Sequence, residues 1–127
     1  IDMDTFNQIL ELDDEDEDDR EFSKGMVYEY FAQVAKTFKD LDAALDEKDL
    51  PNLSSLGHYL KGSSAALGVT HVQASCEKIQ HYGALRDEDK NENLSTDQAL
   101  ILIRRTLARC KKDYAVAHEW LREFYDE

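Results

Sequence analysis

The sequence is poor in the residues that interrupt helices, with one proline, Pro51, and five glycines among 127 residues. It has no alternating strand pattern of any length, and no apolar run approaches the roughly 20 residues of a membrane span. Two cysteines, Cys76 and Cys110, are too few for the disulfide framework of a small secreted protein. These absences favour an all-α chain without a membrane span, with two reduced thiols in its core as in an intracellular protein.

Positive charge is also scarce in this chain. Fifteen lysines and arginines face 28 aspartates and glutamates, which gives a formal net charge of -13. Such a charge repels the phosphates of nucleic acids and of anionic membrane surfaces, so neither is an expected partner. It is compatible with binding to other proteins, and a hydrophobic fraction of 42% is enough to build one substantial core.

Apolar residues recur at spacings of three and four along most of the chain, which is the pattern of amphipathic helices. The pattern predicts a short helix opened by Asp4, a helix over about 23–46, and a third over 51–67 that ends at Gly68. The second helix carries one continuous apolar seam. Its members are Val27, Phe31, Val34, Phe38, Leu41 and Leu45.

Two further helices complete the predicted fold. Thr70 is expected to cap the fourth helix, whose inner stripe runs to Gly83, and a polar loop over about 87–93 follows. Ser95 is expected to cap the longest helix, which continues to about Phe124. Short connections between four long helices predict an all-α, antiparallel up-down-up-down four-helix bundle with the additional short N-terminal helix across one end. Residues 1–127 are expected to form one domain.

An acidic run at residues 13–19 separates the first two helices. Three of its aspartates occupy alternate positions, as in a calcium-binding loop. However, Asp19 stands where that loop needs glycine, and Gly25 stands where it needs a bidentate glutamate. The run therefore predicts a solvated loop and not a calcium site.

His58 lies on the predicted third helix, opposite the arc of leucines that faces the core. At roughly 100° per residue, the residues around it on the outer face are small, and Gly62 lies one turn away. A lone surface histidine usually has no function, and a run of small residues can also serve helix packing, for which Ser63 and Ser64 lie near the inner arc. Gly62 and Ala65 lie on the outer arc, where small side chains favour the approach of another surface.

The chemistry available to an exposed imidazole is nucleophilic attack. A neutral histidine near its unperturbed pKa of about 6.5 needs no carboxylate to activate it. Lys61 follows at the third position, so its ammonium group can reach an anion held on His58. This combination is suited to transient phosphorylation by an acyl phosphate.

The stretch His58-Tyr59-Leu60-Lys61-Gly62-Ser63-Ser64-Ala65 resembles the signature of histidine-containing phosphotransfer (HPt) domains. The resemblance extends beyond this stretch to the HPt proteins of the fungal osmosensing phosphorelay. It includes the acidic run and residues 3–12, 22–26 and 76–80. The resemblance implies that a receiver domain of a hybrid sensor kinase donates a phosphoryl group, which passes to receiver domains of response regulators. It implies no kinase or phosphatase activity of the chain itself and no cofactor, Mg2+ being expected in the partner receiver. The expected location is the cytoplasm and nucleus. A monomer is expected because the bundle closes on itself.

The resemblance also assigns roles to individual residues. His58 is the phosphorylated residue, through Nε2, while Lys61 and Gly62 support the phosphoryl group and permit close approach. Ser63 is expected near the site, and Gln80 on the neighbouring helix is expected to orient or flank the imidazole. Fungal members often carry an arginine at the position of Ala84. Here the nearest arginine is two residues later and points roughly 160° away.

An apolar patch for partner binding is predicted beside the histidine. Ile9 and Phe22 are expected to contact the partner, and Phe6 to hold the short helix on the bundle. The remaining members of the patch are Met3, Met26 and Glu29.

Three other classes of protein are alternatives to a phosphotransfer protein. A di-metal bundle requires inward Glu-x-x-His pairs, and the sequence has none, so no metal site is expected and His71, His81 and His118 are predicted on the surface. A nucleotide-dependent kinase requires a glycine-rich phosphate loop, which is also missing. A non-catalytic helical adaptor shares the predicted fold and patch, so only phosphate uptake separates it from a phosphorelay intermediate.

Overall fold

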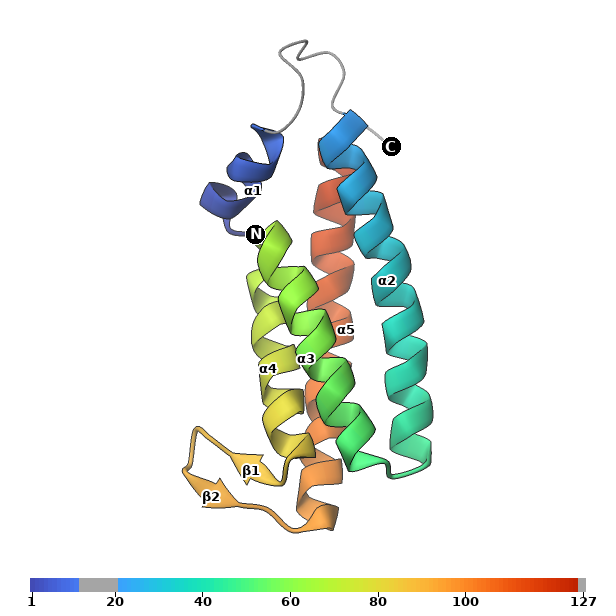
Figure 1. Ribbon diagram of the computed structural model, residues 1–127, viewed down its shortest axis with the longest axis vertical. Helices are drawn as coiled ribbons and strands as arrows, with labels where there is room; N and C mark the ends of the chain where they lie inside the picture. The colour runs from blue at the N-terminus through green and yellow to red at the C-terminus, as the bar shows by residue number, and fades with distance from the viewer. Residues whose placement is uncertain (12–20, 126–127) are drawn as a thin grey trace.

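A computed structural model of the protein describes residues 1–11 and 21–125. Its helices and strands are α1 (Met3–Leu10), α2 (Glu21–Asp46), α3 (Leu50–Leu67), α4 (Thr70–Gly83), β1 (Arg86–Asp87), β2 (Glu92–Asn93) and α5 (Thr96–Phe124). Helices α2 to α5 run alternately down and up as an antiparallel bundle, with α1 at its upper end (Figure 1). The predicted bundle is confirmed. The acidic run, and the calcium pattern considered for it, lie outside the described residues.

Local capping explains most of the helix ends. Ser95 and Gln98 form the capping box of α5, and Gly68 ends α3 in the left-handed conformation, with φ 78°, as predicted. The prediction for Thr70 is wrong, because Thr70 is the first residue inside α4 and Val69 is the cap residue, without a side-chain hydrogen bond. Val69 is buried, so tertiary packing fixes this turn where a capping side chain was expected.

The seam of α2 differs in part from its predicted form. Phe31 and Phe38 are only half-buried, at the edge between α2 and α5, where Phe38 packs edge-on against Tyr114 at a ring distance of 5.5 Å. Tyr30 is buried in their place, and its hydroxyl lies 2.7 Å from the hydroxyl of Ser64 on α3. Within the run of small residues on α3, Ser64 is therefore the buried residue that contacts α2. It lies on the inner side of α3.

Two glycines set the close approach of α3 and α4. A Cβ atom added to Gly57 would lie 2.9 Å from the backbone oxygen of Cys76 and 2.9 Å from the backbone nitrogen of Gln80. One added to Gly83 would lie 2.7 Å from the backbone nitrogen of Ser54. No other residue type fits at either place without a backbone shift. This contact brings Gln80 beside the turn of α3 that carries the histidine.

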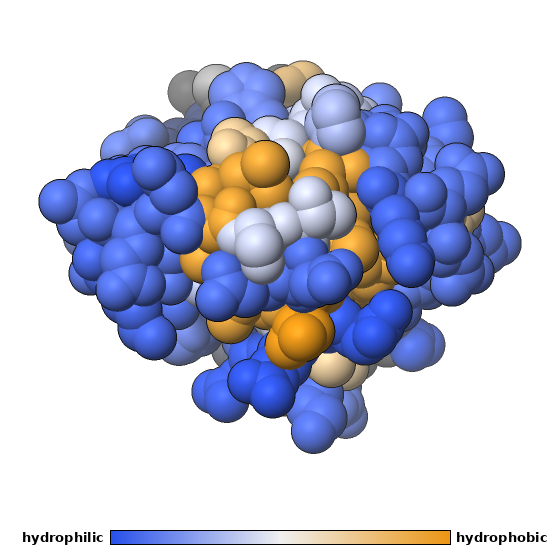
Figure 2. Space-filling model, turned by 90° about the horizontal axis from the view of Figure 1, so that it is seen from below, coloured by the Kyte–Doolittle hydropathy of each residue, from blue (hydrophilic) through white to orange (hydrophobic). Residues whose placement is uncertain are grey.

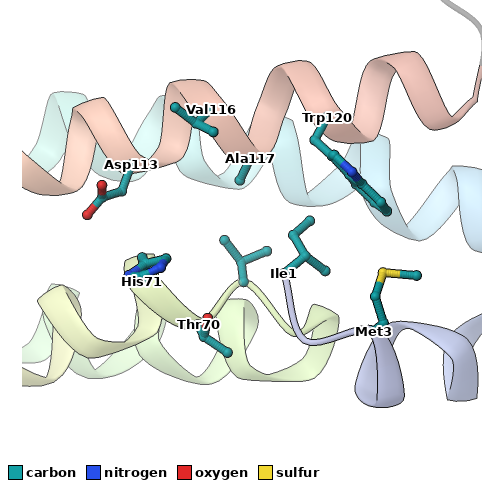
Figure 3. A pocket seen from close by; sticks show the side chains of 9 residues that line it. Ile1, Met3, Thr70, His71, Asp113, Val116, Ala117 and Trp120 are labelled. Carbon is teal, nitrogen blue, oxygen red and sulfur yellow. The ribbon is translucent and has the colours of Figure 1, made fainter.

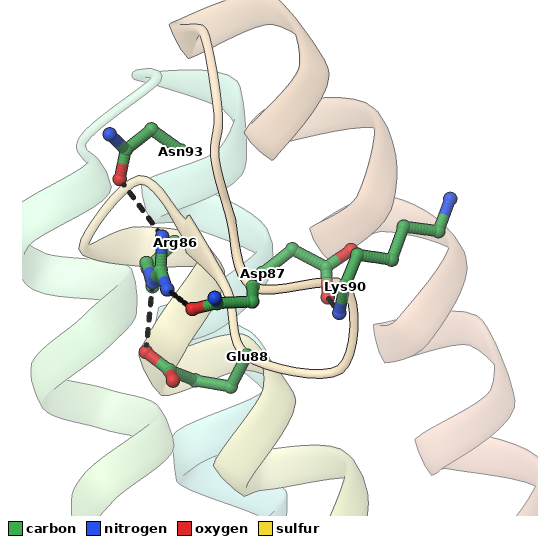
Figure 4. A network of polar contacts seen from close by, with 6 residues as sticks. Arg86, Asp87, Glu88, Lys90 and Asn93 are labelled. Carbon is green, nitrogen blue, oxygen red and sulfur yellow. Dashed lines mark hydrogen bonds and ion pairs between the residues drawn. The ribbon is translucent and has the colours of Figure 1, made fainter.

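The connection from α4 to α5, for which the sequence predicted a polar loop, is a short hairpin. Leu85 and Asn91 adopt positive φ angles of 63° and 54°, and β1 pairs with β2 in antiparallel register. The Arg86 guanidinium donates hydrogen bonds to Glu88, Asn91 and Asn93 within the hairpin (Figure 4). Arg86 is thereby held at the lower end of the bundle.

The predicted core thiols are present, since Cys76 and Cys110 are both free and buried. A hydrogen bond with Cys110, together with burial, raises the pKa of the Cys76 thiol, so that it stays protonated. Among the described helices, none is long and apolar enough to cross a membrane.

Candidate functional site

His58 lies on the outer face of α3, with its imidazole exposed. The buried positions of α3 include Leu53, Gly57 and Leu60, so the helix phase predicted from the sequence is confirmed. Within the described residues the imidazole makes no hydrogen bond and no ion pair. Both ring nitrogens are therefore accessible to another molecule.

The surface beside the imidazole is open. A Cβ atom added to Gly62 would meet nothing within 4 Å, in contrast to one added to Gly57. Gly62 thus has no packing role, and helix propensity alone would favour alanine there by about 1 kcal/mol. What the glycine provides is clearance next to His58 for an approaching surface.

Lys61 and Ser63 have different surroundings. Lys61 is partly exposed, and its ammonium group has no hydrogen-bond or ion-pair partner among the described residues, so it is free to meet an anion. The Ser63 hydroxyl donates a hydrogen bond to the Tyr59 carbonyl at 3.4 Å and faces a hollow between α2 and α3. Five residues along a helix correspond to about 140°, so Ser63 lies away from the imidazole face.

Gln80 supplies an unusual polar group on α4. Its backbone carbonyl accepts a hydrogen bond from the Ser54 hydroxyl at 2.8 Å. Its side-chain Oε1 atom is buried and has no hydrogen-bond partner among the described residues. A buried acceptor without a donor is costly, so a donor that paired with this oxygen would stabilise the site.

The predicted apolar patch divides into packing residues and exposed residues. Phe22 is 54% exposed and Met3 is 40% exposed, whereas Ile9 is 6% exposed, so the prediction of an exposed Ile9 is wrong. Ile9 and Phe6 are three residues apart and share the face of α1 that packs on the bundle. Phe6 holds α1 to α5, as predicted, with its ring 5.2 Å from that of Phe124.

Met26 and Glu29 line the hollow between α2 and α3, whose volume is about 220 Å³. Gln33 and Ala66 line it as well, and the sequence reasoning missed both. The spacing of Met26, Glu29 and Gln33 is that of one helix face, so a helical wheel of α2 contained the signal. Tyr59, which is exposed and directly follows His58 in the sequence, was not among the predicted site residues either.

The three other histidines occupy different environments. His71 is exposed, and His81 is partly exposed. His118 is packed against Phe31 at a ring distance of 4.3 Å, and burial, with a contribution from Arg122, lowers its pKa. In the part of the chain that the structure describes, no group of three or more histidines, cysteines or carboxylates could hold a metal ion.

Comparisons with known proteins agree with this site. Residues 25–113 match the model of the Hpt domain family. Multistep phosphorelay regulator 1 of Schizosaccharomyces pombe is 48% identical over 128 residues, covering 100% of this chain and 43% of that protein. The phosphorelay intermediate protein Ypd1 of Saccharomyces cerevisiae is 46% identical over 78 residues, covering 61% of this chain and 45% of Ypd1. The aligned residues therefore make up less than half the length of each of these two relatives.

The fold also matches solved structures. A co-crystal structure holds the Saccharomyces cerevisiae histidine phosphotransfer signaling protein Ypd1 with the receiver domain of its downstream response regulator Ssk1. Its similar chain superposes on this one with a TM-score of 0.84 and 32% identity, covering 99% of this chain and 94% of the other. A triclinic crystal form of Ypd1 gives a TM-score of 0.85 at 31% identity.

Proposed function

The chain belongs to the Hpt domain family, and we propose that it is a phosphorelay intermediate. In this role His58 accepts a phosphoryl group from the aspartyl phosphate of one receiver domain and passes it to an aspartate of a second. The observation that carries the proposal is an exposed imidazole, without a partner among residues 1–11 and 21–125, beside the open surface at Gly62. The Ypd1 structure with a bound receiver domain supports a receiver as the source of the phosphoryl group.

The transfer needs one nucleophile and one leaving group. The lone pair of His58 Nε2 attacks phosphorus, the bond between phosphorus and the aspartyl oxygen breaks, and the carboxylate leaves with its electron pair. The ammonium group of Lys61 offsets charge on the phosphoryl oxygens. If the Gln80 side chain rotated toward α3, its Oε1 atom, which has no partner among the described residues, would accept a hydrogen bond from Nδ1–H and fix the tautomer with Nε2 free. The second transfer is the reverse reaction with a different carboxylate.

Recognition of the receiver is assigned to apolar residues of α2, the helix that packs against α3. Phe22, Met26 and the hollow that Glu29 lines offer an apolar surface with a polar rim, as protein interfaces have. The receiver-bound structure of the similar protein Ypd1 supports this class of partner.

Phosphate uptake from a phosphorylated receiver domain, assayed with Mg2+ present for the receiver, tests the proposal. The expected product is base-stable, acid-labile phosphate on the protein, lost in His58→Gln, which keeps the fold because the side chain is exposed. His71→Gln is the matched control and should retain full uptake. Receiver binding without any uptake by the unaltered chain would instead identify a non-catalytic adaptor, and label on another histidine would contradict the assignment to His58.

A further inference from the structure

An apolar groove lies on the side of the molecule formed by α5, the start of α1 and the start of α4 (Figure 3). Its volume is about 240 Å³, and Ile1, Met3, Val69, Val116 and Trp120 line it. Val116 is 72% exposed and Trp120 is 37% exposed, which is unusual for such large apolar side chains. Neither contributes to the site around His58.

The wall of the groove is held in place before any ligand arrives. The indole of Trp120 stacks on Phe124 at a ring distance of 5.6 Å and meets Phe6 edge-on at 5.8 Å. These contacts fix the ring between two aromatic residues of the bundle, and its remaining face borders the groove. A fixed aromatic wall binds an apolar side chain with little loss of conformational entropy.

A cationic stripe continues from the groove along α5. Five of the chain's 15 lysines and arginines fall within residues 104–112, and no acidic residue lies between Asp97 and Asp113. The net charge of the chain is -13, so the residues outside this +5 segment carry -18. Arg105, Arg109 and Lys112 follow one another at helical spacing and lead by four residues to Val116.

Most of this charge is not neutralised within the molecule. Arg109 forms an ion pair with Asp113 at 3.4 Å, and Lys111 forms one with Asp42 at 2.8 Å. Both pairs are on the surface, where such pairs contribute little. The remaining three cations, Arg104, Arg105 and Lys112, are exposed and have no partner among the described residues.

We propose that the outer face of α5, from Arg104 to Trp120, binds an acidic amphipathic helix of a partner protein. The apolar side chains of that helix enter the groove beside Trp120, and its carboxylates lie along the cationic stripe. The rise from Arg105 to Val116 is about 17 Å at 1.5 Å per residue, so the partner segment spans about three turns.

This surface is separate from the site at His58. The main helix contacts join α2 with α3, α3 with α4, α4 with α5 and α2 with α5, so α3 and α5 lie diagonally across the bundle. His58 lies on the outer face of α3, and the stripe lies on the outer face of α5. One partner can therefore remain bound at α5 while a receiver exchanges phosphate with His58.

Trp120 is the only tryptophan in the chain, so its fluorescence reports on the groove directly. The probe is a synthetic 15-residue peptide with leucines at positions i, i+3 and i+7 of one half, glutamates along the outer face of the other half, and alanines elsewhere, because alanine favours the helix. It should bind the protein with an affinity that weakens as salt is raised, because the contacts include exposed charges. A peptide with lysine in place of every glutamate should bind at least about tenfold more weakly.

Matched variants locate the binding surface. Arg105→Glu with Lys112→Glu, and separately Val116→Asp, should each weaken binding of the acidic peptide by about tenfold or more. Lys36→Glu with Lys39→Glu makes the same charge change on the exposed face of α2 and should have little effect. All of these side chains are exposed, so circular dichroism should show an unchanged fold.

Four outcomes would overturn the inference. One is binding of the lysine peptide as tight as that of the glutamate peptide, and another is a loss of affinity for the acidic peptide in the α2 variant as large as in the α5 variants. A third is tighter binding of the protein to phosphatidylserine vesicles than to the acidic peptide. The fourth is self-association on sedimentation that Val116→Asp abolishes. Phosphate transfer from a receiver should be unaffected by saturating peptide, and a block of transfer would show that the two surfaces overlap. The inference does not rest on the function proposed for His58, because the fluorescence titration requires no receiver.

Discussion

Two glycines on successive turns of α3 have opposite surroundings. At the scale of single residues, one allows α3 to pack closely on α4 and the other leaves the surface beside His58 open. Gly57 faces the backbone of α4, and Gly62 faces open space. The same residue type therefore serves the bundle at one position and the incoming partner at the other. Substitutions at the two positions should act on different measurable quantities.

Gly62→Gln is expected to raise the free energy of unfolding by up to about 1 kcal/mol, because glutamine is a better helix former than glycine. The same change should slow phosphate transfer, because the new side chain crowds the imidazole of His58. Urea denaturation and rapid-quench transfer kinetics measure the two effects. Gly57→Ala is the contrasting variant and should destabilise the bundle, since its Cβ atom would lie 2.9 Å from the backbone of Cys76. A destabilised Gly62→Gln with normal transfer would assign Gly62 to packing.

Lys61→Ala should leave affinity for an unphosphorylated receiver nearly unchanged, because the ammonium group has no anion to contact in that complex. The rate of transfer or the lifetime of phosphohistidine should fall by about tenfold, the cost of one hydrogen bond to a charged group. Titration and rapid-quench kinetics on the same samples check this. Lys36→Ala, on the exposed face of α2, controls for the loss of one charge. Loss of receiver binding by Lys61→Ala would make the lysine a docking residue.

At the scale of secondary-structure elements, α1 divides its side chains between the bundle and the solvent. Phe6 and Ile9 are buried, whereas Met3 is exposed. Ile9→Ala should therefore destabilise the protein by about 2–4 kcal/mol, as truncation of a buried isoleucine does. Phe22→Ala, at the exposed start of α2, should leave stability within about 0.5 kcal/mol and weaken receiver binding by about 1–2 kcal/mol. Equal effects of both variants on receiver binding, with no loss of stability for Ile9→Ala, would contradict this division.

Features set by neighbouring residues within one helix could be predicted from the sequence, whereas contacts between helices could not. The phase of His58, the cap at Ser95 and the stop at Gly68 depend on residues within a few positions, so local patterns were sufficient. The burial of Ile9 depends on the angle at which α1 meets the bundle. The close approach at Gly57 likewise depends on α4, which lies about twenty residues away in the sequence. Such contacts are decided by tertiary packing and leave no periodic signal in the chain.

At the scale of the whole molecule, the contact between α2 and α5 should make stability depend on pH. Burial beside Phe31, with the nearby Arg122, lowers the pKa of His118 from its ordinary value of 6.5. The unfolded chain then binds a proton more readily than the folded chain. The contribution of His118 to stability is therefore complete above pH 6.5 and is lost as the pH falls below that value.

Urea denaturation at a series of values between about pH 5 and pH 8 measures this dependence. His118→Gln should flatten the decline in stability at the acidic end, because it removes the titrating group. His71→Gln, which alters an exposed histidine, should leave the decline unchanged. An identical acidic decline in His118→Gln would assign it to other groups.

The hairpin between α4 and α5 closes itself, through strand pairing and the hydrogen bonds of Arg86, and this has an evolutionary consequence. Its two strands join the helices whatever the length of chain between them, so insertions at the tip leave the bundle intact. Doubling the length of such a connection costs only about 0.6 kcal/mol of loop entropy. Descendants of this fold can therefore acquire new segments at the end farthest from α1 while the helices that carry His58 stay unaltered.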